Sequence, residues 1–170
     1  MQLLTEICEK DLDMLESGQD IEYKIRRAAR AVIFDEDGNV ALLYVTKDGY
    51  HKIPGGGIEE GESIKEALHR EALEEAGCEI EITDELGLIL EDRTQKNIFQ
   101  INYCFIAKTK TIGEPNFTEK EKANGFKLEW LPIDEAIAIA EKDKPKKYMA
   151  KFMRYRDLIY LKKAKSLKEG

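Results

Sequence analysis

The sequence has few cysteines, and it lacks both a long apolar segment and an excess of basic residues. Only three of its 170 residues are cysteine. Cys8, Cys78 and Cys104 form no C-x-x-C pair, so reduced thiols in a cytoplasmic protein are the simplest interpretation. The longest uncharged stretch, residues 97–107, is far shorter than the roughly 20 apolar residues that span a bilayer. The acidic N-terminus also lacks the basic start and apolar core of a signal peptide. We therefore expect a protein that is neither secreted nor membrane-spanning.

The charge is negative overall and unevenly distributed. A net charge of -7 at pH 7 argues against nucleic acid as the main partner, since phosphate backbones are bound mainly by lysine and arginine. Residues 144–170 nevertheless contain ten basic and two acidic residues, which makes this segment about +8 and the remainder about -15. A solvated basic helix is the ordinary interpretation, and attraction of phosphate or docking onto an acidic partner is the alternative.

Length and patterning predict one domain with an alternation of strands and helices. A chain of 170 residues buries enough surface to fold without disulfides or structural metals. We expect three parts: an N-terminal extension (1–25), the main domain (26–145) and a basic C-terminal helix packed on it (146–170).

Helices are predicted at 3–17, 63–76, 132–141 and 148–163. Strands are predicted at 28–34, 40–45, 51–53, 79–82, 86–91, 98–106 and 126–131. A polar loop is expected over 115–125. Strands on both sides of helix 63–76 favour an α/β fold with helices on two faces of a sheet.

In strand 98–106, alternate apolar side chains are expected to share one face: Phe99, Ile101, Tyr103 and Phe105. Pro54 and the following glycines break regular structure, so they leave backbone N–H and C=O groups open to a ligand.

The predicted helix 63–76 carries an unusual cluster of acids. Glu71, Glu74 and Glu75 share an arc of roughly 100° on the helical wheel. This arc overlaps the apolar stripe, so Glu71 and Glu75 should lie at the edge of the buried side. Like charges at this spacing repel, the helix C-terminus disfavours anions, and Arg70 can neutralise only one of them.

A divalent ion would balance this excess of charge. Oxygen ligands favour magnesium or manganese, and no cluster of histidine and cysteine suggests zinc. A solvated acidic face is the alternative interpretation. The overlap with the apolar stripe and the glycines upstream favour the metal site.

These residues follow a known pattern. Gly56, Glu62 and the run from Arg70 to Cys78 resemble the Nudix box, G-x5-E-x7-R-E-U-x-E-E-x-G-U, in which U is a bulky aliphatic residue. Every charged and glycine position is filled, although Ala72 and Cys78 are smaller than the aliphatic residues typical of the family. The resemblance implies a Nudix-like α/β/α sandwich with a mixed central sheet and a loop–helix–loop catalytic motif. It also implies magnesium-dependent hydrolysis of a nucleoside diphosphate linked to another moiety, with manganese as a substitute.

The resemblance also implies roles for individual residues. It assigns the metal to the carbonyl oxygen of Gly55 and to four glutamates: Glu62, Glu71, Glu74 and Glu75. Glu62 would make a second-metal or structural contact, and Arg70 would orient the glutamates. Removing a proton from the attacking water requires a nearby carboxylate. Glu71 is one candidate, and a loop before the late strand offers Glu119 or Glu121.

The substrate is expected to be a small nucleotide, and a homodimer is compatible with the sequence. Lys52 and Arg30 could meet phosphate oxygens beside Gly56 and Gly57, although a surface lysine and a strand-end arginine are the common alternatives. The sequence marks of the ADP-sugar, dinucleoside polyphosphate and coenzyme A groups are missing. By elimination we favour a nucleoside triphosphate or modified nucleotide, followed by ADP-ribose or another nucleoside diphosphate derivative. A non-catalytic nucleotide sensor or protein-binding module on the same fold is the alternative of another class.

Overall fold

The computed structural model describes residues 1–18 and 20–170, and its centre is a mixed eight-stranded sheet. The strands are β1 (Leu3–Ile7), β2 (Lys24–Phe34), β3 (Asn39–Val45), β4 (Tyr50–Lys52), β5 (Gly55–Gly57), β6 (Cys78–Arg93), β7 (Ile98–Ile112) and β8 (Phe126–Pro132). The main order is β1-β6-β7-β2-β3-β4, while β5 pairs with β2 and β8 pairs with β3. The pairs β1–β6 and β2–β7 are parallel, and the other pairs are antiparallel.

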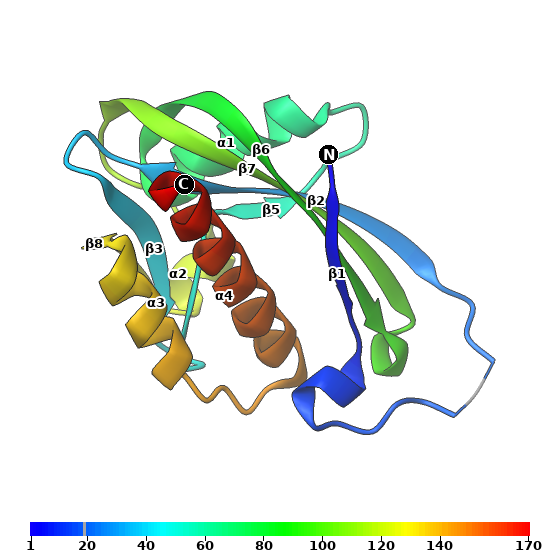
Figure 1. Cartoon of the computed structure of the whole chain (residues 1–170). Coiled ribbons are helices and arrows are strands. Elements are labelled where there is room, and N and C mark those ends of the chain that lie inside the picture. The colour runs from blue at the N-terminus through cyan, green and yellow to red at the C-terminus, as the bar shows by residue number, and fades with distance from the viewer. Residues whose placement is uncertain (19) are drawn as a thin grey trace.

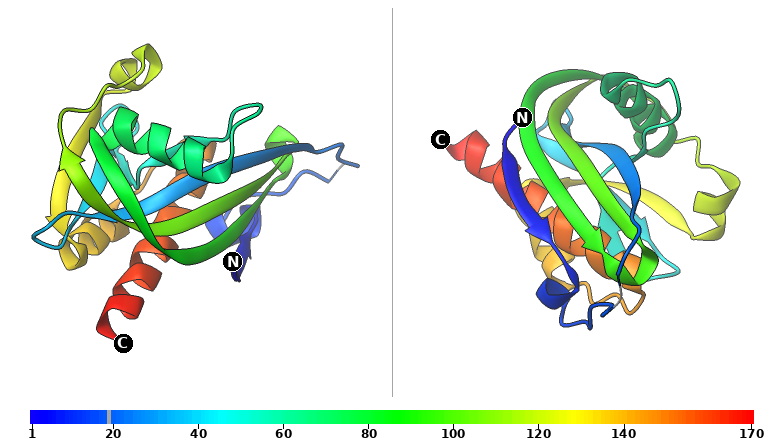
Figure 2. Two further views of the ribbon diagram at one scale, coloured as in Figure 1. Left: turned by 90° about the horizontal axis from the view of Figure 1, so that it is seen from above. Right: turned by 90° about the vertical axis from the view of Figure 1, so that its right-hand side faces the viewer.

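Helices cover both faces of this sheet, as the α/β/α prediction requires (Figures 1 and 2). The helices are α1 (Ile64–Ala76), α2 (Glu119–Ala123), α3 (Ile133–Lys142) and α4 (Tyr148–Glu169), with the short 3-10 helices η1 (Glu9–Leu12) and η2 (Thr94–Lys96). One core cluster joins α1 to the sheet, and a second joins α3 and α4 to its opposite face. The predicted fold class is confirmed.

The alternation of side chains along the central strands determines what each helix meets. In β2, Ala31 and Ile33 pack in the core cluster of α1, whereas Val32 and Phe34 pack in the cluster of α3 and α4. Arg30 has the same parity as Val32, so it points toward α4. Strand β2 therefore brings a buried arginine to the face that α4 covers.

Helix α1 forms where the sequence predicts it, and its ends are well capped. The Ser63 side chain accepts a hydrogen bond from the backbone N–H of Glu66, and the Glu66 carboxylate reaches back to the Ser63 N–H. Gly77 takes the left-handed conformation that ends the helix. These caps fix the start and end of the acid-bearing helix.

The predicted helix over residues 3–17 is wrong. Leu3–Ile7 forms β1, which pairs in parallel with Leu88–Glu91 of β6, and only Glu9–Leu12 is helical. Hydrogen bonding to a sheet edge outweighs the local helical pattern of this segment. The structure therefore makes the N-terminal segment part of the sheet.

Other predicted elements differ in extent. The two strands predicted at 79–82 and 86–91 are one strand, β6, whose register shifts between Ile82 and Asp84 and between Glu85 and Gly87. The polar loop predicted over 115–125 contains α2, because the Thr118 hydroxyl caps its first turn. Strand β7 continues to residue 112 and α4 continues to residue 169.

The N-terminal segment is also attached through the buried Glu9. Its Oε1 atom accepts hydrogen bonds from the Tyr148 hydroxyl at 2.6 Å, from Thr94 Oγ1 at 2.8 Å and from the Gln95 N–H at 3.2 Å. Residues from three regions of the chain thus meet on one carboxylate beside the start of α4.

The basic residues of the C-terminal segment lie close to acids of the same chain. Lys162 pairs with Glu141 at 2.6 Å, and Lys165 pairs with Asp134 at 2.5 Å. Such exposed pairs contribute little stability individually. They balance part of the positive charge that the sequence concentrates there. Within the described residues, each helix is too short or too polar to span a bilayer.

Candidate active site

Strand β5 lies between β2 and α1, and its glycines allow a close approach. Gly55 and Gly56 pair antiparallel with Arg30 and Ala29 of β2. A Cβ atom on Gly56 would lie 2.3 Å from Oε1 of Glu71, and one on Gly55 would lie 2.4 Å from the carbonyl oxygen of Ala29. Gly55 also has a φ of 144°. A Cβ atom at Gly55 would meet backbone, and one at Gly56 would displace the Glu71 carboxylate, so glycine allows the close packing of the acidic helix against the strand.

Glu75 is buried and tied to β5. Its side chain is 2% exposed, and its two oxygens accept hydrogen bonds from Lys52 Nζ at 2.7 Å and from the Gly55 N–H at 2.8 Å. Burial raises the pKa of Glu75 to about 7; the charge of Glu71 also raises it, against the lowering effect of Lys52. Glu71 is buried as well. The prediction that Glu71 and Glu75 lie at the buried edge of the helix is confirmed.

Arg70 contacts three of the predicted acids, Glu62, Glu71 and Glu74. Its guanidinium donates to both oxygens of Glu62, at 2.8 and 3.0 Å, and to Glu71 at 2.8 Å. It also donates to the carbonyl of Gly57 at 3.0 Å, while its contact with Glu74 is longer, at 3.4 Å. The hydrogen bond from Arg70 lowers the pKa of Glu62. Arg70 therefore fixes the position of Glu71 and leaves Glu74 only weakly held.

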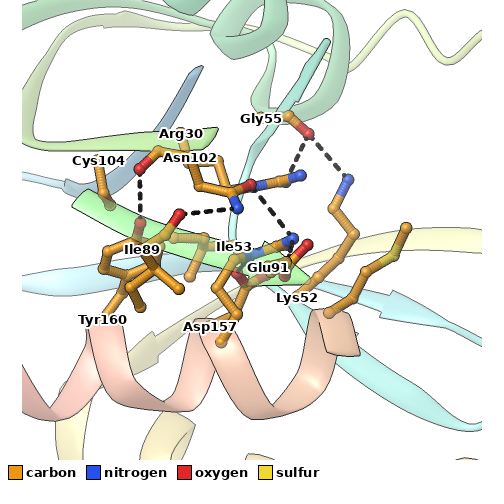
Figure 3. A network of polar contacts seen from close by, with 12 residues as sticks. Arg30, Lys52, Ile53, Gly55, Ile89, Glu91, Asn102, Cys104, Asp157 and Tyr160 are labelled. Atoms are coloured by element: carbon orange, nitrogen blue, oxygen red, sulfur yellow. Dashed lines mark hydrogen bonds and ion pairs between the residues drawn. The ribbon is translucent and has the colours of Figure 1, made fainter. Parts of the chain in front are cut away.

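The carbonyl oxygen of Gly55 is a second point of convergence. It accepts hydrogen bonds from Arg30 Nη1 at 3.1 Å and from Lys52 Nζ at 3.2 Å. Figure 3 shows both side chains directed at this oxygen. Two cationic side chains therefore donate hydrogen bonds to the oxygen atom that the Nudix resemblance assigns as a metal ligand.

The carboxylate and carbonyl oxygens of the site suit a hard divalent ion, although cationic side chains of the protein already contact them. In the part of the chain that the structure describes, no three acidic, histidine or cysteine side chains form a ready metal cluster. Lys52 forms an ion pair with Glu75, and Arg70 forms one with Glu71. Burial and the charge of Glu71 nevertheless raise the pKa of Glu74, so the negative charge is not fully balanced. Carboxylate and carbonyl oxygens are the ligands that magnesium and manganese prefer.

A cleft of about 340 Å³ opens beside these acids. Its lining includes most of the predicted site residues: Arg30, Lys52, Gly55, Gly56, Gly57, Glu71, Glu75 and Glu121. Sequence reasoning did not identify the additional cations, Arg26, Lys120 and Lys147. It also missed most of an apolar wall formed by Tyr50, Phe126, Met149, Ala150 and Met153. A cavity of about 530 Å³ beside Phe34 and Leu167 contains none of the box residues.

Helix α2 distinguishes the two glutamates proposed from the late loop. The Glu119 side chain is 92% exposed and pairs with Lys122 at 3.0 Å. Glu121 lines the cleft, and its charge contributes to the raised pKa of Glu74. Of the two, Glu121 is the one that faces the acids of α1.

The raised pKa of Glu75 predicts a pH-dependent stability. In metal-free protein Glu75 keeps its proton up to about pH 7, whereas in the unfolded chain it ionises near 4.5. Between these values the folded state binds more protons, so the contribution of Glu75 to the free energy of unfolding falls as pH rises. The expected fall is on the order of 2 kcal/mol, and Glu75→Gln removes it. Urea unfolding in EDTA at about pH 5 and about pH 7.5 measures this difference. Equal pH slopes in both proteins would contradict it.

A family model described as the NUDIX domain matches residues 24–154. The chain is 28% identical to mouse diphosphoinositol polyphosphate phosphohydrolase 3-alpha over 123 residues, which are 71% of this chain and 72% of that protein. It is 32% identical over 73 residues to an RNA pyrophosphohydrolase of Wolbachia pipientis subsp. Culex pipiens, 42% of each chain. A NUDIX hydrolase from Nitrosomonas europaea superposes with a TM-score of 0.58 at 23% identity, over 78% of this chain and 89% of that one.

The structural match shows the shared fold, and the family model covers most of the sequence. The chain therefore belongs to the Nudix family and is a Nudix-type diphosphohydrolase.

Proposed function

We propose that this hydrolase cleaves a diphosphate bond in a nucleotide, with a nucleoside triphosphate or a modified nucleotide as the favoured substrate. The observation that carries the proposal is the composition of the cleft. Buried glutamates lie beside several cations, and an apolar wall faces them. Phosphates and a nucleobase need these two kinds of surface side by side.

Each part of the cleft has a distinct task in this proposal. Arg26, Lys120 and Lys147 bind phosphate oxygens as charged partners. Phe126 and Met153 provide an apolar surface for the face of a base. Because the cations and the apolar wall belong to one cleft, a single extended molecule can contact both.

Glu71, Glu74 and Glu75 with the carbonyl of Gly55 would hold the divalent ion that Nudix hydrolases generally use, usually magnesium. Such an ion, when bound, neutralises the diphosphate and lowers the pKa of a bound water. Lys52, which contacts Glu75 and the Gly55 carbonyl, would turn from these ligand atoms to a phosphate oxygen, the role expected for it from the sequence.

The remaining steps belong to side chains of the protein. Arg70 keeps Glu71 oriented through its hydrogen bond at 2.8 Å. Glu121, at the edge of the cleft, is the proposed general base that removes a proton from the attacking water, and Glu71 is the second candidate. Arg30 keeps a positive charge beside the Gly55 carbonyl, next to where phosphates would lie.

A second candidate substrate is a highly phosphorylated molecule without a base. The five cationic side chains of the cleft favour it: Arg26, Arg30, Lys52, Lys120 and Lys147. The mouse relative is named a diphosphoinositol polyphosphate phosphohydrolase. ADP-ribose or another nucleoside diphosphate derivative is the alternative nucleotide, and a nucleotide sensor without turnover is the alternative of another class.

A substrate panel tests these proposals. With magnesium, purified protein is expected to release a nucleoside monophosphate from at least one member of a panel of nucleoside triphosphates, modified nucleotides and ADP-ribose. EDTA should abolish this release. A diphosphoinositol polyphosphate in the same panel tests the second candidate. Nucleotide binding without turnover on any compound would favour the sensor and contradict the proposed hydrolysis.

A further inference from the structure

Helix α4 places two charged residues inside the protein, directly behind the cleft. Arg156 is 0% exposed and Asp157 is 1% exposed. Arg156 Nε donates to Asp157 Oδ1 at 2.6 Å, and Arg156 Nη1 donates to Glu91 Oε1 of β6 at 3.1 Å. The pair therefore lies between α4 and the sheet, on the face to which Arg30 points.

One connection runs from Asp157 to the glycine strand. Oδ2 of Asp157 accepts a hydrogen bond from the backbone N–H of Ile53 at 3.1 Å. Ile53 and Pro54 join β4 to Gly55, and Ile53 is itself fully buried. Asp157 thus fixes the backbone just before the carbonyl on which Lys52 and Arg30 converge.

A second connection reaches the same carbonyl through side chains. Arg156 Nη1 approaches Oδ1 of Asn102 at 3.5 Å, and this oxygen also accepts from Arg30 Nε at 3.3 Å. Arg30 Nη1 then donates to Gly55 at 3.1 Å. Figure 3 shows Asn102 between the helix and Arg30. The two connections start from adjacent residues of α4; one ends at Ile53, two residues before Gly55, and the other ends at the Gly55 carbonyl.

The energetics of this network disfavour a purely stabilising role. Buried ion pairs are often no more stable than apolar residues of similar volume, because desolvation offsets their attraction. Here three guanidiniums, those of Arg30, Arg93 and Arg156, are buried together with the carboxylates of Glu91 and Asp157. In addition, Arg93 Nε and Arg156 Nη2 are buried and have no hydrogen-bond partner among residues 1–18 and 20–170. An arrangement that costs this much desolvation suggests a task other than stability.

We propose that Asp157 and Arg156 are positioning residues, which hold the Gly55 carbonyl and the Arg30 guanidinium in place at the cleft. This inference rests on the proposed function, because it assigns the Gly55 carbonyl to the metal and Arg30 to the phosphates. It gives the C-terminal helix a role in the site that is independent of its exposed basic residues.

The test compares Asp157→Asn with a control on the same helix. Asparagine keeps the shape and one acceptor, but it removes the charge that orients Arg156. Arg154→Met is the matched control, since Arg154 donates to the carbonyls of Ala140 and Glu141 at 2.7 Å and so anchors α4 to α3. Three quantities are measured: the melting temperature, the Kd for Mn²⁺ without substrate, and kcat and KM with the best substrate of the panel.

Asp157→Asn is expected to weaken Mn²⁺ binding about 10- to 100-fold and to lower kcat, as for other residues that orient metal ligands. Arg154→Met is expected to lower the melting temperature while the Kd for Mn²⁺ stays that of the wild type. If Asp157→Asn does not fold, Arg156→Lys, which keeps the charge but loses the planar fork, provides the same measurements.

Wild-type Mn²⁺ affinity and kcat in Asp157→Asn, or in Arg156→Lys if that is the variant that folds, would overturn the inference. A wild-type protein without turnover on any compound would instead contradict the proposed function. In that case the Mn²⁺ measurements alone decide whether α4 positions the site.

Discussion

Glu75→Gln is expected to reduce diphosphate hydrolysis by more than about 100-fold, beyond the effect usual for residues that only orient metal ligands. Glutamine has nearly the same shape, so it can still accept the hydrogen bond from Lys52 or from the Gly55 N–H. It cannot supply the negative charge that we assign to a divalent ion. The measurement is kcat/KM with magnesium on the best substrate, together with the Kd for Mn²⁺.

Glu81→Gln is the matched control for Glu75→Gln, because Glu81 is an exposed glutamate outside the cleft. It should keep the wild-type rate, and both variants should remain folded by circular dichroism. Hydrolysis by Glu75→Gln within a few-fold of the wild type would show that Glu75 does not hold the ion.

Gly56→Ala is expected to lower activity by about 100-fold, comparable to the loss of a preorganised catalytic group. The new methyl group would lie 2.3 Å from Oε1 and 2.7 Å from Cδ of Glu71, so the carboxylate must move. The end of a glutamate side chain moves more easily than backbone. Stability should therefore fall far less than activity. Steady-state kinetics and thermal unfolding of the same samples measure both effects.

Gly18→Ala controls for the general cost of adding a methyl group, since a Cβ atom there meets none of the described residues beyond its chain neighbours within 4 Å. Wild-type kinetics are expected for this variant. If Gly56→Ala retained full activity, the position of Glu71 against β5 would be unimportant for catalysis.

The acidic helix and its surroundings could be predicted from sequence because the relevant signals are local. The capping residues of α1 and the overlap of acids with an apolar stripe lie within one short segment. The burial of Glu71 and Glu75 follows from helical geometry alone. The prediction that Pro54 and the following glycines break regular structure is wrong, because Gly55–Gly57 forms β5 and pairs with β2. At positions 55 and 56 glycine instead allows the close approach of the β2 backbone and of the Glu71 carboxylate.

The hydrogen bonds of Arg156 and Asp157 behind the cleft could not be predicted because they join residues that are far apart in the sequence. Asp157 and Ile53 are far apart in sequence, and no local pattern pairs them. Strand β7 did carry a weak signal. Tyr103 and Phe105 pack toward α1 on one face, as the alternation predicts, and the buried, polar Asn102, next to Tyr103, lies on the opposite face. A polar residue on the inner face of a strand needs partners. Here Gln100, Arg30 and the Ile89 carbonyl provide them, and Arg156 of α4 adds a longer contact at 3.5 Å. Strand β1 was missed for the same reason, since its partner is distant in sequence.

The dependence of Gly55 on Asp157 also affects when this enzyme can become active during synthesis. Helix α4 follows every strand of the sheet in the chain, so a ribosome has already released the box glutamates when Asp157 emerges. Domains tend to fold as their segments leave the ribosome. In a nascent chain the acids of α1 would therefore lie beside a Gly55 strand that Asp157 does not yet hold, and turnover would begin only after α4 docks.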